Sequence, residues 1–276
     1  MPYRIAGVDV HKKMLAVAIA DVEVEGEWRF ERRQFGTSPT QLQELAEWFA
    51  ECDVEEVVME STAQYWRPVW ETLERQWAPQ RRACLDAVPT TGRLHLAQSQ
   101  SNRGARGRKR DFADAERLVK RLVAQELTLS FVPDVEQRLW RTVMRRKHQL
   151  TCSRVQLQNR LEALLEEMHI KLSSLVSDLL GPSARRMLQT IADGATDPTA
   201  VAALAHQRLR ATPDTLADAL GACRDLPRVY RHLLQLTLDE LRLIEAQIAA
   251  LNHEMAELLR AHEAADRKST RLNSSH

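Results

Sequence analysis

The sequence has no long apolar run. None of its hydrophobic stretches approaches the roughly 20 residues that a helix needs to cross a bilayer, although 44% of its 276 residues are hydrophobic. The N-terminus "MPYRIAGVDVHKK" also lacks the basic, apolar and small-residue regions of a signal peptide. We therefore expect a globular protein of the cytoplasm, with no membrane partner.

Cysteine is scarce and widely spaced. Cys52, Cys84, Cys152 and Cys223 form no CxxC pair, and no histidine stands near them at zinc-binding spacing. This spacing argues against a disulfide framework and against a structural zinc site. The four residues are expected to be ordinary thiols in a reducing compartment.

The chain also has almost no excess charge, because 39 Lys and Arg residues balance 38 Asp and Glu residues to give a net charge of +1. The net charge gives no sign of a polyanionic partner, but the distribution of charge along the chain does. One short stretch without any acid contains Arg103, Arg106, Arg108, Lys109 and Arg110. Such a run is most often a solvated loop, but directly before a pair of acids it favours a segment that guides nucleic acid into a site.

The first third of the chain alternates strand-like and helical segments. Runs of β-branched and small apolar residues predict strands at 3–10, 14–24 and 27–36, which are too close for an intervening helix and so form an antiparallel meander. Further predicted elements are a helix over 37–52, a strand over 55–61, a helix over 64–77 and a strand over 81–87. This order predicts an α/β domain with a mixed sheet covered by helices, over residues 1–130.

From about residue 136 the pattern is entirely helical. Val143, Leu150, Leu157 and Leu164 recur every seven residues. A later segment has a similar alternation, through Leu234, Leu241, Ile244, Ile248, Leu251, Met255 and Leu258. Both patterns predict long helices with coiled-coil seams, over residues 131–265. Between them, breaks at Pro182, Pro198 and Pro213 predict short helices.

Four acids stand where a hydrophobic pattern would not place them. Asp9 interrupts the first strand and Glu60 closes the fourth. Asp111 and Asp114 stand at the start of a helix, at a spacing that puts both on one face. If the first and fourth strands pair in parallel, Asp9 and Glu60 lie side by side, and a helix packed across them brings the two aspartates opposite.

Each acid also has a purely structural explanation. Asp9 would be a loop acid or a hydrogen-bonded core acid, and Glu60 a charge at a strand end. Asp111 would be an N-cap, and the negative charges of Asp111 and Asp114 would interact favourably with the helix macrodipole. Their combination on this topology is what favours a functional site.

Four carboxylates around one cleft repel one another unless cations offset their charge. Oxygen ligands suit Mg²⁺ or Mn²⁺, and two such ions about 4 Å apart stabilise in-line attack on a phosphodiester. We therefore expect Asp9, Glu60, Asp111 and Asp114 to be both the catalytic and the metal-binding residues, with two ions bound.

Several blocks of the sequence resemble, in the same order, the DEDD transposases of the one-ten insertion-sequence family, which are bacterial RuvC-like recombinases. The blocks are "GVDVHKK", "MESTAQYWRPVW", "GRKRDFADAERLVKRL", "SFVPDVEQRLWRTVMRRKHQL" and "IKLSSLVSDLLG". The resemblance implies an RNase H-like (RuvC-like) first domain, and the four acids match the family's four metal-binding acids position by position. It also implies DNA partners (element ends and target), a guide RNA for some members, and a homo-oligomer built through the coiled coil.

The sequence departs from the family's pattern in places. Arg110 stands where the family usually has Thr, and Ala63 where Gly usually follows "EST", but neither change removes a ligand. Family members carry a further catalytic domain with a nucleophilic serine after the coiled coil, and nothing in this sequence matches it. The last residues, 266–276, can be back-translated into a string that resembles a widely used sequencing adapter. We expect that tail to be an artefact, and its serines are not candidates for the nucleophile.

Together these features predict a transposase or site-specific recombinase of a bacterial insertion sequence, an enzyme that cleaves and transfers DNA strands at a metal-dependent DEDD site. Two alternatives stay open. One is a Holliday-junction-type nuclease on the same fold. The other is a fragment that binds nucleic acid and oligomerises without full activity.

Overall fold

The computed structural model describes residues 3–22, 28–61, 63–78, 93–99, 111–206 and 209–273, with the backbone alone for 111, 261 and 263–273. The chain divides into two compact units, Met1–Val132 and Pro133–His276. Each unit has its own hydrophobic core, so each is described by itself.

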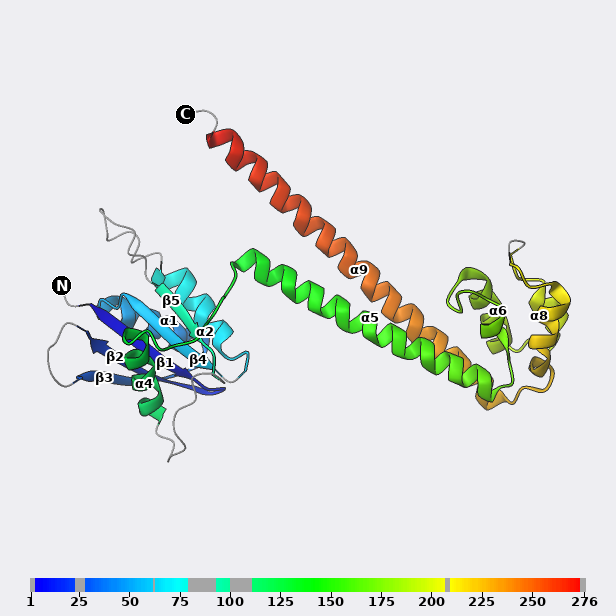
Figure 1. The fold of residues 1–276 in the computed structure, drawn as a ribbon, viewed down its shortest axis with the longest axis horizontal. Coiled ribbons are helices and arrows are strands. Elements are labelled where there is room, and N and C mark those ends of the chain that lie inside the picture. The colour runs from blue at the N-terminus through cyan, green and yellow to red at the C-terminus, as the bar shows by residue number, and fades with distance from the viewer. Residues whose placement is uncertain are drawn as a thin grey trace. The chain divides into compact units, whose positions relative to one another are not determined.

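The first unit is built on a six-stranded mixed sheet with the order β3-β2-β1-β4-β5-β6 (Figure 1). Its first three strands, β1 (Arg4–Val10), β2 (Met14–Asp21) and β3 (Phe30–Gly36), form the predicted antiparallel meander. The others are β4 (Glu56–Ser61), parallel to β1, β5 (Arg93–Ala97), parallel to β4, and β6 (Leu129–Ser130), antiparallel to β5. The strand order is that of the RNase H-like fold, which confirms the expected fold class.

Strand β5, which pairs with β4 on the side away from β1, was not predicted from the sequence. The segment expected to be the fifth strand, residues 81–87, lies outside the described residues. The strand that pairs with β4 is instead Arg93–Ala97, "RLHLA", in which His95 interrupts the apolar pattern. Its short length and its internal histidine explain why the period of two was not recognised.

Helices cover both faces of this sheet. On one face α1 (Pro39–Glu51), α2 (Trp66–Thr72) and the π-helical turn η1 (Leu73–Trp77) enclose the main core of the unit. On the other face lies α4 (Asp111–Val123), whose Leu118 and Val119 pack on residues of β1, β2, β4 and β5. Figure 1 shows α4 and α1 with the sheet between them. The α4 face is the one that carries the candidate site.

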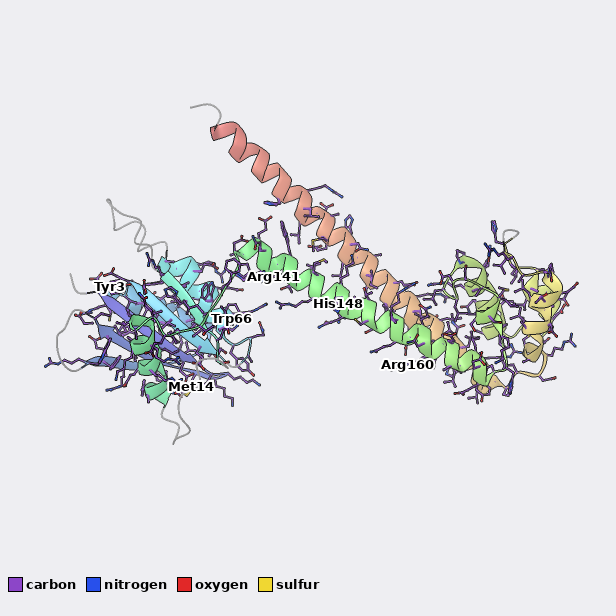
Figure 2. All side chains as sticks on the ribbon, viewed as in Figure 1. Tyr3, Met14, Trp66, Arg141, His148 and Arg160 are labelled. Atoms are coloured by element: carbon purple, nitrogen blue, oxygen red, sulfur yellow. The ribbon has the colours of Figure 1, made fainter. Side chains whose placement is uncertain are left out.

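The second unit is all helical, as the sequence predicted. Its long helices are α5 (Val135–Glu167) and α9 (Arg228–Asn273), and they pack against each other. Glu136 of α5 lies 3.6 Å from His262 of α9, and Arg154 lies 2.9 Å from Glu245. Because residues early in α5 meet residues late in α9, the two helices run antiparallel. Figure 2 shows Arg141, His148 and Arg160 spread along α5.

The predicted seams lie in this helix pair. Leu150 and Leu157 of α5 and Leu234 and Leu241 of α9 are buried. The remaining seam positions of both helices, from Val143 to Leu258, are partly buried. Apolar spacing thus predicted which side of each helix faces its neighbour.

Short helices close one end of the pair. These are α6 (Pro182–Ala192), α7 (Pro198–Ala202) and α8 (Pro213–Ala219), with the 3₁₀ turns η2 (Leu172–Ser174) and η3 (Gly221–Asp225). All three predicted prolines stand in the first turn of a helix, where a missing N–H costs no hydrogen bond. This confirms the breaks that the sequence indicated.

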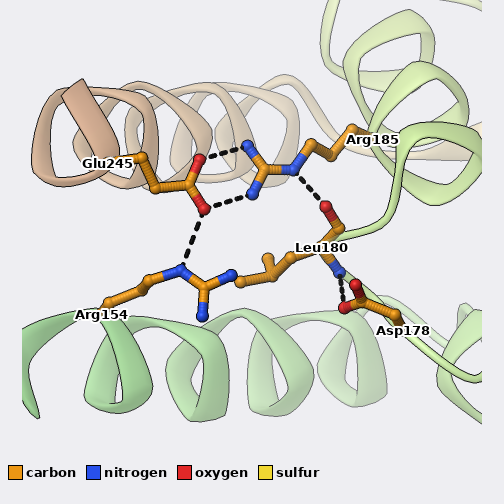
Figure 3. A network of polar contacts seen from close by, with 5 residues as sticks. All are labelled: Arg154, Asp178, Leu180, Arg185 and Glu245. Carbon is orange, nitrogen blue, oxygen red and sulfur yellow. Dashed lines mark hydrogen bonds and ion pairs between the residues drawn. The ribbon is translucent and has the colours of Figure 1, made fainter. Parts of the chain in front are cut away.

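One ionic network joins three helices of the second unit (Figure 3). The guanidinium of Arg185 on α6 donates two hydrogen bonds to the Glu245 carboxylate on α9, of 2.6 and 2.5 Å, and Arg154 on α5 donates a third of 2.9 Å. The Arg185 Nε also donates to the carbonyl of Leu180, whose own N–H donates to Asp178 over 2.9 Å. Glu245 thereby fixes the lateral position of α6 against both long helices.

In the described part of the chain, the helices are too short or too polar to pass through a lipid bilayer.

Candidate catalytic carboxylate site

Two neighbouring strands place Asp9 and Glu60 side by side. In the parallel pairing of β1 with β4, Asp9 is the register partner of Glu60. Alternate residues of a strand share a face, and both acids lie on the face that α4 covers, because Ile5 of β1 and Val58 of β4 pack on that helix. The adjacency that the sequence predicted for a parallel pairing is confirmed.

The approach of α4 depends on Gly7. A Cβ at this position would lie 2.1 Å from the Ala115 carbonyl oxygen and 2.9 Å from a Val119 methyl carbon. The register neighbour of Gly7 on β2 is Ala18, which is also small. Because no side chain of β1 separates the backbones here, α4 lies close to the sheet, and the charge of Asp114 acts on Glu60 of β4.

The electrostatics of Glu60 reflect this crowding. Burial raises the pKa of the Glu60 carboxyl, and the negative charges of Asp9 and Asp114 raise it further, while Arg117 and Arg121 act in the opposite sense. The Glu60 side chain is only 15% exposed. Ionised Glu60 is therefore costly unless a cation lies nearby.

Among the described residues, Arg117 is the cation that pairs with Glu60. It stands one helical turn after Asp114 on α4 and forms an ion pair with that residue, while its Nη2 lies 3.6 Å from Glu60 Oε2. Glu60 Oε2 and Arg117 Nε are both buried, and neither has a hydrogen-bond partner within the described residues. The site therefore contains a buried acceptor and a buried donor that no described residue satisfies with a hydrogen bond.

Asp9 has a different neighbour. The Nε2 atom of His11 lies 3.0 Å from Asp9 Oδ2, and the Asp9 side chain is 13% exposed. His11 follows β1 directly, so the strand end supplies both the acid and the imidazole.

The four predicted acids are not all seen together. Asp111 begins α4, but its side chain lies outside the described residues. Among the side chains that the structure describes, no three His, Cys, Asp or Glu residues form a group of the kind that holds a metal ion. The described geometry unites Asp9 with Glu60, and Glu60 with Asp114 through Arg117.

The sequence also shows to which family the chain belongs. Residues 6–170, more than half of the chain, match the family model for DEDD transposases of the IS110 type, described as "Transposase". The chain belongs to this transposase family. The resemblance recognised in the sequence is thus confirmed, and Asp9, Glu60, Asp111 and Asp114 all fall inside the matched region of the transposase.

The transposase chain has no match among the curated proteins. Among solved structures it is similar to RuvC of Thermus thermophilus, with 13% identity and a TM-score of 0.31, over 46% of this chain and 99% of that one. The same RuvC in complex with a Holliday junction substrate gives 12% identity and a TM-score of 0.30, over 46% and 99%. The Aquifex aeolicus PPX-GPPA enzyme gives 17% identity and a TM-score of 0.24, over 37% and 38%. At such low TM-scores the fold assignment rests on the strand order and the family match.

A hollow of about 360 Å³ opens in the transposase at the carboxyl ends of β4 and β5. Its lining includes Ser61, directly after Glu60, and Trp66, Ala97 and Gln98. Trp66 is partly buried and stands edge-on to Trp70, which is a core residue with 7% exposure. The hollow provides polar hydrogen-bonding groups and one aromatic ring, and Asp9, Glu60 and Asp114 are not among its lining residues.

The predicted nucleic-acid-binding residues of the transposase, Arg103, Arg106, Arg108, Lys109 and Arg110, lie outside the described residues. Their role stays a prediction.

Sequence reasoning missed two residues of the site, Arg117 and His11. Arg117 had a usable signal, because it stands three positions after Asp114 and residues so spaced share a helix face. His11 stands two positions after Asp9 but beyond the strand, where the alternation of faces no longer predicts its direction.

Proposed function

We propose that this transposase cleaves and transfers DNA strands of a bacterial insertion sequence at a metal-dependent site formed by Asp9, Glu60, Asp111 and Asp114. The observation that carries the proposal is the register pairing of Asp9 with Glu60 under a tightly packed α4. Membership of the transposase family supplies the substrate class, DNA.

The residues fit a divalent metal. All four proposed ligands offer carboxylate oxygens, the donors that Mg²⁺ and Mn²⁺ prefer. Glu60 Oε2 is buried without a hydrogen bond in the described structure, and the pKa of Glu60 is raised by burial and by neighbouring acids. A bound cation would relieve both features. When bound, one or two such ions lower the pKa of an attacking water or hydroxyl group and stabilise the leaving oxygen.

The protein's own groups then have separate roles. Asp9 and Glu60, held on adjacent strands, provide a rigid pair of ligands, and Asp111 and Asp114 add ligands from α4. His11 orients the Asp9 carboxylate, because its Nε2 lies 3.0 Å from Oδ2. Arg117 neutralises Glu60 and Asp114 before the metal binds.

The partners follow from the same proposal. We place the DNA of the element ends and of the target along the basic stretch that includes Arg108 and Lys109, since this stretch leads directly into α4. A guide RNA and a homo-oligomer formed through the coiled-coil region are proposed from the family resemblance.

The test is a strand-cleavage assay with the purified chain, Mg²⁺ or Mn²⁺, and labelled DNA that carries an element end beside its target. We expect metal-dependent nicking that Glu60→Gln abolishes. Joined products identify strand transfer, whereas cut products alone on branched DNA identify a junction nuclease.

The exposed residue Glu44 on α1 provides the matched control, because Glu44→Gln removes the same charge away from the site. DNA binding without cleavage under any metal condition would favour the third possibility, a fragment that binds nucleic acid and oligomerises. Cleavage that survives Glu60→Gln would refute the proposed site.

A further inference from the structure

Helix α5 has a long basic segment that contains no acid. Between Glu136 and Glu162 the sequence carries no Asp or Glu. It carries seven basic residues there: Arg138, Arg141, Arg145, Arg146, Lys147, Arg154 and Arg160. The whole chain has 39 basic and 38 acidic residues, so the excess of positive charge over these 25 positions is a local feature of α5.

Part of this charge faces solvent. Arg141, Arg145, Arg146 and Arg160 are all exposed, and we call these four residues the α5 basic face. At 3.6 residues per turn, Arg141 and Arg145 point away from the seam that Leu150 and Leu157 form with α9. The spaces between the arginines are filled by neutral polar residues such as Gln149, Gln156 and Asn159, which are hydrogen-bonding groups without negative charge.

The helix pair does not neutralise this face. On α9 three acids already have cationic partners on other residues. Glu245 binds Arg154 and Arg185, Asp239 binds Arg242, and Glu257 binds Arg260. Within the described residues, no ion pair is formed by any arginine of the α5 basic face.

We propose that the α5 basic face binds the sugar–phosphate backbone of duplex DNA. Guanidinium groups bind phosphates with charge-assisted, often bidentate hydrogen bonds, and neutral amides nearby add contacts without repulsion. From Arg141 to Arg160 the helix rises about 28 Å, which matches about eight base pairs along one strand. This site is distinct from the carboxylate site, and the choice of DNA as occupant rests on the proposed function.

The test measures binding of the full chain to a labelled DNA duplex over a series of salt concentrations, without metal so that cleavage does not interfere. The variant Arg141→Gln/Arg145→Gln/Arg146→Gln removes three charges at exposed helical positions and keeps good helix formers. The slope of log affinity against log salt is expected to become shallower by up to about 2.7, because each lost phosphate contact contributes about 0.9.

A matched control removes three exposed arginines elsewhere in the same unit, Arg210→Gln/Arg224→Gln/Arg228→Gln. This control should leave the salt slope unchanged. If the salt slope falls equally in both variants, binding responds to net charge alone. If the salt slope is unchanged in the α5 variant, the α5 basic face is only solvated and does not contact DNA. Either result overturns the proposal.

Two further arms separate the alternatives. If the α5 variant loses binding to duplex RNA but retains binding to duplex DNA, the α5 basic face binds RNA, and the DNA assignment is overturned. Glu60→Gln should retain the full salt slope while losing cleavage. Failure of the carboxylate site and failure of the α5 basic face are therefore distinguishable in one set of proteins.

Discussion

Asp9 and Glu60 are direct neighbours across the parallel pair β1–β4, on the face that α4 covers. Two carboxylates in register on adjacent strands repel each other, and the structure places nitrogen-bearing side chains on either side of them. His11 lies against Asp9, and Arg117 lies between Glu60 and Asp114. Among the described residues, the charge of this acid cluster is only partly offset.

The first prediction concerns the ligands. Asp9→Asn or Glu60→Gln should lower the affinity for Mn²⁺ by at least tenfold, because each removes one negative charge from a buried ligand position, and a tenfold loss corresponds to about 1.4 kcal/mol. Isothermal titration measures the affinity, and circular dichroism checks that the fold is retained. Unchanged metal affinity in both variants would count decisively against the site, while Glu44→Gln should behave as the parent protein.

Much of this first unit was predictable from the sequence. The meander β1–β2–β3 follows from closely spaced apolar runs, and the meeting of Asp9 with Glu60 follows once β1 and β4 are taken as parallel. In the second unit, heptad spacing predicted the buried sides of α5 and α9 and the prolines predicted three helix starts. These features depend on local periodicity and on proline's fixed backbone angle, and both can be recognised from short segments of the sequence.

The features that were missed depend on contacts distant in the chain. β5 is short, contains His95 and is completed by hydrogen bonds to β4, so its own pattern is weak. The cationic role of Arg117 depends on how closely α4 lies over β4, which Gly7 permits. A sequence pattern gives the face on which a residue lies, but not the separation of two elements.

The second prediction concerns that separation. Gly7→Ala should destabilise the protein by about 1–3 kcal/mol, a typical cost of overpacking, because the new methyl group would lie 2.1 Å from the Ala115 carbonyl oxygen. Displacement of α4 should also weaken Mn²⁺ binding. Urea denaturation and metal titration measure the two effects. Gly221→Ala is the control, since a Cβ there meets nothing within 4 Å and should change stability by only a few tenths of a kcal/mol.

The third prediction concerns Arg117. If its guanidinium must leave Glu60 and Asp114 before a metal ion binds, Arg117→Gln should tighten Mn²⁺ binding by roughly two- to fivefold, because partly exposed ion pairs of this kind contribute up to about 1 kcal/mol. The metal-free protein should at the same time lose thermal stability, since Glu60 and Asp114 lose the counter-charge of Arg117.

Titration of the variant with Mn²⁺, followed by thermal unfolding with and without the ion, measures both effects. Lys120→Gln is the matched control on the same helix, because Lys120 lies over the ring of Phe30, away from the acids. Weaker metal binding in Arg117→Gln would show that Arg117 supports the ligands rather than competing with the ion.

The last prediction concerns the Glu245 network of the second unit. Glu245→Gln should cost about 1.5–3 kcal/mol, the range for hydrogen bonds to charged groups, because Arg185 and Arg154 both lose their carboxylate partner. The hydrogen bond from Arg185 is the main cause that lowers the pKa of Glu245 below its ordinary value of 4.5, and burial opposes it. A carboxyl whose pKa is lowered on folding contributes stability above its unfolded pKa and loses it as the pH falls through the folded pKa. Urea denaturation at several pH values should therefore show the full difference between parent and variant near neutral pH, and a shrinking difference once the pH falls below 4.5. A difference that stays constant into that acidic range would show that packing by the side chain, and not its charge, stabilises α6 against the long helices.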